Sequence, residues 1–476
     1  MLPNDVLPRI FYFYLNKEMD GYFEPFKKQC ITLLHVCQRW RSVVFQSSGR
    51  LNLRLLCTHK TIARDIQNIW PPLPLVIRNA FRDEALSVDN IIAILEHNDR
   101  VCQIELKSLT SSQFEYVTNS AAMQKPFPKL TDLRLCGKMK STLPVSFLDG
   151  TTPRLRSLHL SRVPFPGLPK LLLSATHLVD LQVDLTDIPH DSAGYVQPEA
   201  MTASLSALTS LELLRLEFRY PPPFVFRPLR SRFPPPPLPT PARSNLPSLT
   251  EFRFKGGSEY LEKILTWIDA PRLNELHITF FDQRIYDLPQ LCQFISRRPT
   301  LRAPKIGHVT CCLEAISVRF PSQTPDRGVL SVQILYQWSG RQLSSLEQVC
   351  TPSLPPVSTL EDLYILDNPC WRLRYLDNIK VELWQDFLRP FVAVKNLYLS
   401  GVFVPHIAPA LQDLDEDEIT EVLPTLENLF LEGLESSEPF YAYIKEFADA
   451  RQLTGHPVAV SRWDGNSKRA FIDVSG

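Results

Sequence analysis

The chain has 476 residues and a formal net charge of zero, from 51 basic and 51 acidic side chains. A balanced charge argues against a nucleic-acid or membrane-surface binder, which would carry a basic excess. No apolar run approaches the ~18 residues of a membrane span, and the short N-terminal apolar stretch holds Pro8 and Arg9, unlike a signal peptide. We therefore expect an intracellular protein, cytoplasmic or nuclear or both, whose partners include neither nucleic acid nor membrane.

Ten cysteines are scattered along the chain, and most of them lie in apolar runs. Scattered thiols of this kind are typical of reduced, buried side chains in an intracellular protein. Cys311 and Cys312 near His308 come closest to a metal site, but zinc needs more clustered ligands. The sequence holds neither a glycine-rich phosphate loop nor a nucleophile motif, and its histidines are dispersed. We therefore predict no catalytic residue, no metal and no cofactor, and a chain that is not an enzyme.

The first expected elements are two amphipathic helices near the N-terminus. Apolar side chains recur at helical spacing within 6–11 and again within 33–44. These residues are Val6, Leu7, Ile10, Phe11, Leu33, Val36, Cys37, Trp40 and Val44. A unit of about 45 residues cannot bury that much apolar surface internally. The surplus predicts a partner protein; the alternative is a helical cap on the following domain, with Trp40 as a core aromatic.

The same two segments resemble the F-box, which opens with Leu-Pro, an acidic residue and an apolar helix and closes with a Val-Cys-x-x-Trp helix. The matching residues are Leu2, Pro3, Asp5, Val6, Leu7, Ile10, Val36, Cys37, Arg39, Trp40 and Arg41. The resemblance covers roughly residues 1–55 and departs from the family in two ways: only Met1 precedes the Leu-Pro, and the segment 16–29 is longer than usual. This insertion and the run 36–44 resemble F-box proteins of mushroom-forming (basidiomycete) fungi.

The F-box resemblance implies the substrate-recognition adaptor of an SCF-type (Skp–cullin–F-box) ubiquitin ligase. In such assemblies the F-box binds a Skp-type adaptor, which joins a cullin, while the rest of the chain holds an unknown protein substrate. The residues that would contact the adaptor are Leu2, Pro3, Val6, Leu7, Ile10, Phe11, Leu33, Val36, Cys37, Trp40 and Val44. Two alternatives remain: an F-box scaffold bound to the Skp-type adaptor outside ubiquitin ligases, and a non-enzymatic repeat scaffold whose N-terminus merely caps the repeats.

A phrase of the form apolar-x-x-apolar-x-apolar, often preceded by proline, recurs from about residue 100. Copies begin at Val101, Pro128, Pro153, Leu178, Leu211, Pro247, Pro271, Leu360, Val394 and Pro424. The last two apolar residues of each copy alternate with polar ones, which predicts a half-buried strand. A strand and a return segment repeated every ~20–40 residues are typical of a leucine-rich-repeat solenoid, in which each unit buries the apolar edge of its neighbour.

We therefore predict an α/β fold in which an N-terminal helical F-box precedes an irregular leucine-rich-repeat solenoid. Its parallel strands would form the concave face, with helices and loops outside. The expected domains are an F-box-like module over 1–55, a linker and solenoid cap over 56–99, the solenoid over 100–435, and a C-terminal helix and tail over 436–476. The helix is expected over 439–450, where proline occupies a favoured helix start.

Three stretches interrupt the repeat. Residues 221–241 are rich in proline and predict an extended insertion, with an SH3-like groove ligand as the alternative. In 315–336 the repeat pattern is lost, and two runs of alternating apolar and polar residues, 315–320 and 329–336, predict a hairpin. The acidic run 413–421 lacks the spacing of a calcium loop and predicts a solvated helix face. Its buried side would be Leu414, Ile419 and Val422.

The alternation also predicts which side chains point to the concave face. The central column, between the last two apolar positions of each copy, contains Arg134, His159, Gln182, Arg215, Arg253, His277, Tyr364, Tyr398 and Phe430. The adjacent column contains Asp132, Ser157, Asp180, Leu213, Glu251, Glu275, Asp362, Asn396 and Asn428. Opposite charges in neighbouring columns can satisfy each other across strands.

The central column ends in three aromatic residues. Exposed aromatic side chains in a row are favoured as interface anchors, and the basic residues earlier in the same column leave recognition of a phosphate mark open. We expect the substrate-binding residues to be Tyr364, Tyr398, Phe430, Arg134, Arg215 and Arg253. The alternative is that a C-terminal helix over 441–450 folds over the aromatic residues.

Overall fold

The computed structural model describes residues 6–15, 32–47, 51, 53–57, 73–79, 87–138, 141–186, 196–218, 244–283, 285–312, 315–321, 328–336, 346, 348, 355–367, 380–414, 418–433 and 439–464. The chain divides into two compact units, Met1–Val196 and Gln197–Gly476, and each is described by itself. Among the described residues, every helix is too short or too polar to traverse a lipid bilayer. The predicted insertion 221–241 lies outside the described residues.

The first unit begins with helices α1 (Val6–Leu15) and α3 (Gln38–Gln46), with helical residues 32–36 directly before α3. The thiol of Cys37 caps α3 by accepting a hydrogen bond from the Trp40 amide at 3.4 Å. One apolar cluster joins these helices to the start of the sheet. Its buried members are Leu7, Phe11, Leu33, Leu34, Val43, Val44, Leu51, Leu53 and Leu73.

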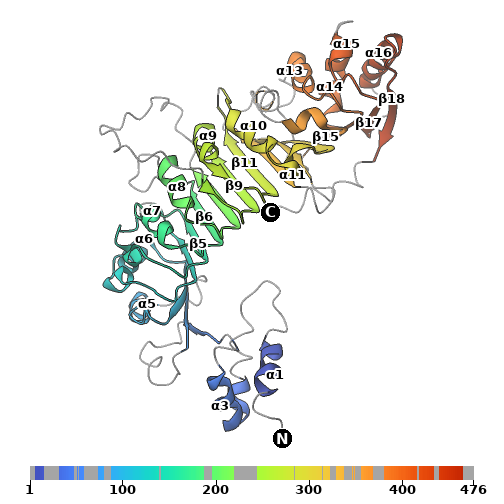
Figure 1. The fold of residues 1–476 in the computed structure, drawn as a ribbon. Coiled ribbons are helices and arrows are strands. Elements are labelled where there is room, and N and C mark those ends of the chain that lie inside the picture. Colours follow the sequence, from blue (N-terminus) through green and yellow to red (C-terminus); the bar gives the residue numbers. More distant parts are fainter. Residues whose placement is uncertain are drawn as a thin grey trace, which may run out of the picture. The chain divides into compact units, whose positions relative to one another are not determined.

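A parallel sheet follows in the first unit (Figure 1). Its strands are β1 (Leu55–Cys57), β2 (Leu75–Asn79), β3 (Val101–Leu106), β4 (Asp132–Cys136), β5 (Ser157–Ser161) and β6 (Asp180–Leu185), paired in that order. Apolar residues stack in register as Ile104, Leu133, Leu158 and Leu181, and all four are buried. Each strand therefore covers the apolar edge of the next, as the repeat predicts.

Short helices connect the strands of the first unit. They are α5 (Val88–Leu95), α6 (Ser111–Thr118), α7 (Leu168–Ser174) and the 3₁₀ turns η2 (Ala121–Gln124) and η3 (Phe147–Gly150). Ser87 caps α5, and Thr110 forms a capping box with Gln113 on α6. The sheet starts earlier than residue 100, because β1 begins at Leu55 and β2 lies within 56–99, where we predicted a linker and cap.

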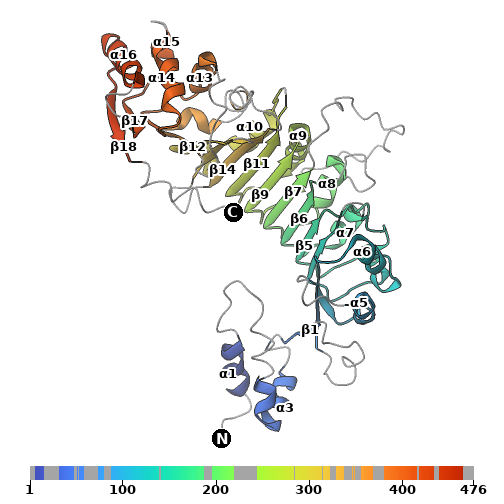
Figure 2. The same cartoon turned by 180° about the vertical axis from the view of Figure 1, so that it is seen from behind.

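The second unit holds a longer sheet, seen from both sides in Figures 1 and 2. Its strands are β7 (Leu213–Phe218), β9 (Glu251–Gly256), β11 (Glu275–Phe281), β14 (Val329–Leu335), β13 (Ala315–Phe320), β12 (Ile306–Cys312), β15 (Asp362–Asp367), β16 (Asn396–Leu399), β17 (Asn428–Glu432) and β18 (Ala459–Trp463), in that spatial order. All neighbours are parallel except those of β13.

The hairpin expected around 315–336 is present, since β13 pairs antiparallel with β14. The strand β12 pairs with the other edge of β13 and was not predicted. The chain thus passes from β11 to β12, returns through β13, and inserts β14 beside β11. The parallel order resumes with β15, which pairs with β12.

Helices connect the strands of the second unit as well. They are α8 (Pro198–Leu205), α9 (Ser258–Trp267), α10 (Pro289–Ser296), α11 (Pro299–Arg302), α13 (Val381–Leu388), α14 (Val404–Gln412), α15 (Glu418–Glu421), α16 (Pro439–Leu453) and the 3₁₀ turn η4 (Pro355–Thr359). A two-stranded sheet pairs β8 (Ser244–Asn245) with β10 (Ile268–Asp269). Several of these helices begin at proline, which explains part of the high proline content.

The predicted α/β class, with a long parallel sheet and connecting helices, is confirmed. Among the residues of the acidic run 413–421 that the structure describes, 418–421 form a helix and 413–414 do not. Leu414, Ile419 and Val422 are buried as expected. The C-terminal helix extends three residues beyond the predicted 439–450. A strand, β18, follows it in the stretch where we predicted only a tail.

Candidate protein-interaction sites

The N-terminal helices divide their apolar side chains between a core and an outer surface. Phe11 is 1% exposed and packs against Trp40 with ring centroids 4.8 Å apart. Leu7, Leu33 and Val44 are buried in the same cluster. These four residues fill the core that holds the helices together, and their contact with a partner stays a prediction.

The outer surface carries Ile10 on α1 and Val36 just before α3, which are 43% and 54% exposed. Val6 and Trp40 are half-buried, and the Cys37 thiol is exposed. Leu2 and Pro3 lie outside the described residues. These helices therefore do leave apolar surface uncovered within the described part of the chain.

Sequence reasoning missed a further part of this outer surface. Tyr12, Phe13 and Tyr14 follow one another on α1 and are all exposed, Phe13 to 73%. The signal was available in the sequence, because four consecutive aromatic residues place apolar groups on every side of a helix. A short helix that is apolar all round cannot be covered by one neighbouring helix.

The strand register confirms both predicted columns within each unit. In the first unit Arg134, His159 and Gln182 lie in register, and so do Asp132, Ser157 and Asp180. In the second unit Arg215, Arg253 and His277 align, as do Tyr364, Tyr398 and Phe430. The central column of the first unit also includes Arg78 and Glu105.

Charges in the first unit are largely paired on the strands. Glu105 lies 2.8 Å from both Arg78 Nε and Lys107 Nζ. Burial alone would raise the pKa of Glu105, but the hydrogen bond and charge of Lys107, with the charges of Arg78 and Arg134, lower it overall. The predicted basic residue Arg134 thus lies beside a carboxylate that offsets its charge.

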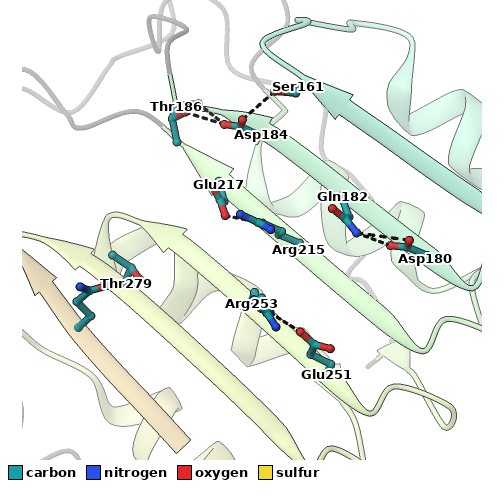
Figure 3. A network of polar contacts seen from close by, with 11 residues as sticks. Ser161, Asp180, Gln182, Asp184, Thr186, Arg215, Glu217, Glu251, Arg253 and Thr279 are labelled. Carbon is teal, nitrogen blue, oxygen red and sulfur yellow. Dashed lines mark hydrogen bonds and ion pairs between the residues drawn. The ribbon is translucent and has the colours of Figure 1, made fainter. Parts of the chain in front are cut away.

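Asp180 is the centre of a second polar cluster, drawn in part in Figure 3. Its carboxylate lies 2.6 Å from His159 Nε2 and accepts a hydrogen bond from Gln182 Nε2 at 3.1 Å. Burial would raise the pKa of Asp180, but these two partners and Ser157 lower it overall. On the same strand Asp184 accepts from Ser161 at 2.9 Å and from Thr186 Oγ1 at 2.7 Å.

The predicted arginines of the second unit are also paired. Arg215 Nε donates to Glu217 on its own strand at 2.5 Å, and Arg253 pairs in the same way with Glu251 (Figure 3). His277 lies 3.5 Å from Glu275. Burial and then the charge of Arg253 lower the pKa of His277. The two predicted arginines of the second unit therefore form intrastrand ion pairs, which offset their positive charge.

The aromatic end of the central column is a stack of parallel rings. The Tyr364 and Tyr398 centroids lie 4.1 Å apart and those of Tyr398 and Phe430 4.5 Å apart, both with 8° between planes. The ring of Trp463 on β18 packs in a T-shaped arrangement against both tyrosines, with its centroid 6.0 Å from that of Tyr364 and 5.5 Å from that of Tyr398. The strand spacing of a sheet, about 4.8 Å, sets this stacking distance.

Exposure differs along the stack. Tyr364 is 1% exposed, whereas Tyr398 and Phe430 are half-buried. The expectation that all three are exposed is therefore wrong for Tyr364. The alternative of a helix over the rings does not hold either, because α16 packs against α14 and the ring that contacts the tyrosines is Trp463.

The adjacent column forms an amide ladder beside the stack, which sequence reasoning did not foresee. Asn428 Nδ2 donates to Asn396 Oδ1 at 2.8 Å, and Asn396 Nδ2 donates to Asp362 Oδ1 at 2.6 Å. All three residues occupied that column in the predicted register, so the signal was present. The ladder fixes the spacing of the three strands that carry the rings.

The described residues contain no group of three or more metal-binding side chains. Comparison with family models finds no match, and comparison with curated proteins finds none. Among solved structures, one similar chain is the leucine-rich repeat-containing protein LegL7 from Legionella pneumophila. It is 13% identical, with a TM-score of 0.27, over 83% of this chain and 98% of that one. Such a low score leaves the repeat character of this chain resting on its own strand register.

Proposed function

We propose that this chain is a non-enzymatic adaptor that joins two other proteins. Its N-terminal helices would bind a Skp-type adaptor, and its strand face would hold a protein substrate, within an SCF-type ubiquitin ligase. The repeat would contribute by raising the substrate's effective concentration near the ubiquitin-charged enzyme. No bond chemistry is assigned to the chain itself.

The observation that carries this proposal is the exposed apolar surface on the N-terminal helices. Ile10 and Val36 come from the two halves of the F-box resemblance, and both are exposed. Burying one such side chain contributes about 1.5–3 kcal/mol. A partner that covers several of them would therefore gain a substantial binding free energy. Trp40, half-buried against Phe11, supports this surface from beneath.

The experiment is co-purification of the tagged full chain with a Skp-type adaptor. The double variant Ile10→Lys/Val36→Lys should lose the adaptor, because two ammonium groups would be buried without partners. Both positions are exposed, so the fold should persist, which circular dichroism checks. The matched control is Leu453→Lys at the end of α16, where the native side chain is 88% exposed. Retention of the adaptor by the double variant would refute the assignment.

Cullin co-purification separates the proposal from its nearest alternative. If the wild-type chain brings down the Skp-type adaptor together with a cullin, the ligase role is supported. If the adaptor arrives without a cullin, the chain is a scaffold outside ubiquitin ligases. If neither arrives, the N-terminal helices belong to a repeat scaffold alone.

The substrate face is proposed to include Tyr398 and Phe430, with Tyr364 as the buried support beneath them. Arg134, Arg215 and Arg253 stay in the proposal as polar contacts whose charges are offset locally. A pull-down should lose at least one protein partner in Tyr398→Ala/Phe430→Ala and keep it in the control Tyr441→Ala, an exposed aromatic on α16. Unchanged recruitment of every partner would reject this face as the substrate site.

A further inference from the structure

The hairpin inserted into the second unit brings Arg319 into the central column. His277 of β11 lies in register with Ser331, Ser331 with Arg319, Arg319 with His308, and His308 with Tyr364. The inserted strands therefore fill the space between the ion-paired strands β9 and β11 and the aromatic strands β15 to β17. They add an arginine that the repeat pattern alone does not predict.

Arg319 has no carboxylate partner, unlike most of the other strand arginines. Arg134 also has a buried Nε without an acceptor, but Glu105 lies in register beside it. Arg78, Arg215 and Arg253 each pair with a carboxylate. Within the described ranges the side chain of Arg319 has no hydrogen bond or ion pair, and its Nε atom is buried without an acceptor. A buried charged donor without an acceptor is costly, and such groups are normally satisfied by a partner, water or a ligand.

The residues around Arg319 in the register explain its unpaired state. The side chains directly opposite are Ser331 and His308, and the diagonal neighbours are Val329, Gln333, Ile306 and Thr310. None of these is a carboxylate. The nearest acidic residues in the two predicted columns, Glu275 and Asp362, lie two strands away, at roughly 10 Å from the strand spacing.

Neutral hydrogen-bonding side chains surround the guanidinium on this face. We call Arg319, Ser331, Ser317, Thr310 and Gln333 the hairpin patch. The hydroxyl groups of Thr310 and Ser317 form a hydrogen bond of 2.5 Å between Oγ1 and Oγ. Thr279 Oγ1 donates to Gln333 Oε1 at 3.4 Å. The hairpin patch thus carries one positive charge, no carboxylate, and several hydroxyl and amide groups that can donate to an oxyanion.

We propose that the hairpin patch binds the carboxylate of an aspartate or glutamate side chain in an extended segment of a partner protein. A guanidinium presents two parallel N–H groups to the two oxygens of a carboxylate. One positive charge matches a single carboxylate, whereas phosphate groups carry nearly two negative charges and are usually met by clusters of arginines. The proposal rests on the proposed substrate role of the strand face and names the chemistry that it selects.

The position of the aromatic stack predicts the second contact of the bound partner segment. Tyr398 is three strands from Arg319 across the sheet, a span of about 14 Å. An extended chain covers this distance in about four residues. The segment would therefore cross the strands and place an aromatic or large apolar side chain about four residues from its acidic residue, against the half-buried rings of Tyr398 and Phe430.

The test uses the full chain and three fluorescent degenerate peptide libraries. Each library has phenylalanine four positions before and after a central residue, which is glutamate, glutamine or phosphoserine. Fluorescence anisotropy should show the glutamate library binding at least tenfold more tightly than the glutamine library. The glutamate library should also bind at least as tightly as the phosphoserine library.

Arg319→Gln should abolish the preference for glutamate. The control Arg389→Gln removes an ion-paired arginine that lies outside the strand face, beside Glu418 and Glu421, and should change the preference less than twofold. Arg319→Lys keeps the positive charge but lacks the two parallel N–H groups of the guanidinium, so we expect a partial loss of the preference for glutamate. This variant also tests the site if Arg319→Gln does not fold. Wild-type binding by both Arg319 variants, or no preference for glutamate, would overturn the site. Tenfold tighter binding of phosphoserine would overturn the carboxylate assignment.

The outcome is separable from that of the proposed ligase role. Arg319→Gln should co-purify with the Skp-type adaptor as the wild type does, because the adaptor site lies on the N-terminal helices. Failure of the peptide test with intact adaptor binding would remove this inference alone. Loss of adaptor binding in Ile10→Lys/Val36→Lys leaves the peptide test unaffected.

Discussion

The N-terminal helices and the strand face treat apolar side chains in opposite ways. On the strands, Leu133, Leu158 and Leu181 are buried in register, because each repeat is covered by the next. On the helices, Ile10 and Val36 stay exposed after the core of that module is complete. Repetition supplies a covering neighbour within the chain, whereas the outer side chains of the helices have no such neighbour among the described residues. This comparison is the reason why we propose partner binding for the helices and a stabilising role for the strands.

The largest expected effects of substitution on stability and on adaptor binding concern two tryptophans, one in each region. Trp384 on α13 is 0% exposed and packs edge-on against Phe387 and Phe403. Trp384→Ala should therefore cost about 3–5 kcal/mol of unfolding free energy. Trp40→Ala should cost less, because Trp40 is only half-buried, yet it should weaken adaptor binding more. Urea unfolding and adaptor co-purification measure the two effects.

The expected pattern is a crossover: Trp384→Ala loses stability and keeps adaptor binding below its unfolding transition, and Trp40→Ala does the reverse. A Trp40→Ala chain with normal adaptor binding would erase the distinction between the two regions. Circular dichroism at the binding temperature shows that each variant is still folded when it is tested.

The amide ladder sharpens the comparison within the strand face. Asn396 both donates to Asp362 and accepts from Asn428, so Asn396→Ala leaves two groups without partners. We expect a loss of about 1–3 kcal/mol. Asn428→Ala removes only the outer bond and should cost about half as much. Equal losses in urea unfolding would show that the ladder does not hold the strands together.

Much of the strand face could be predicted because apolar alternation fixes which side of a strand is buried. The columns from Arg134 to Phe430 follow from that rule alone. The strand β18 could not be found in this way, since its residues are mostly exposed and show no apolar face. Tyr364 was expected to be exposed because the ring that lies against it, Trp463, is distant in the sequence.

The remaining differences between expectation and structure have equally physical causes. The F-box resemblance named Leu7, Phe11, Leu33 and Val44 as partner contacts, but a helical pair must first bury its own core. Arg319 was missed because the position of an inserted hairpin in the sheet depends on pairing between strands distant in sequence. Local periodicity contains no information on that order.

The smallest expected effect concerns the pair of His159 and Asp180 on the first sheet. The pKa of Asp180 is lowered in the folded chain, so its ionised form contributes stability above pH 3.8, the ordinary value for aspartate. That contribution is lost as the pH falls through the lowered value. Asp180→Asn should therefore cost about 1 kcal/mol or less at pH 6, and its difference from wild type should shrink below pH 3.8.

Urea unfolding at pH 6 and pH 3 measures this difference. His159→Gln removes the other partner, and the double variant should lose less than the sum of the two single losses, because the residues are in contact. Additive losses, or a difference that grows at pH 3, would show that the pair does not account for the lowered pKa.

The most direct test of the central claim is alkylation of Cys37 by iodoacetamide, followed site by site with mass spectrometry. Cys37 begins α3 and is exposed, whereas Cys57, Cys102 and Cys311 are buried and act as unreactive references. If the N-terminal helices bind a Skp-type adaptor, a saturating amount of that adaptor should slow modification of Cys37 at least tenfold. An unchanged rate in the presence of the adaptor would contradict the assignment of the exposed helical surface to a partner protein.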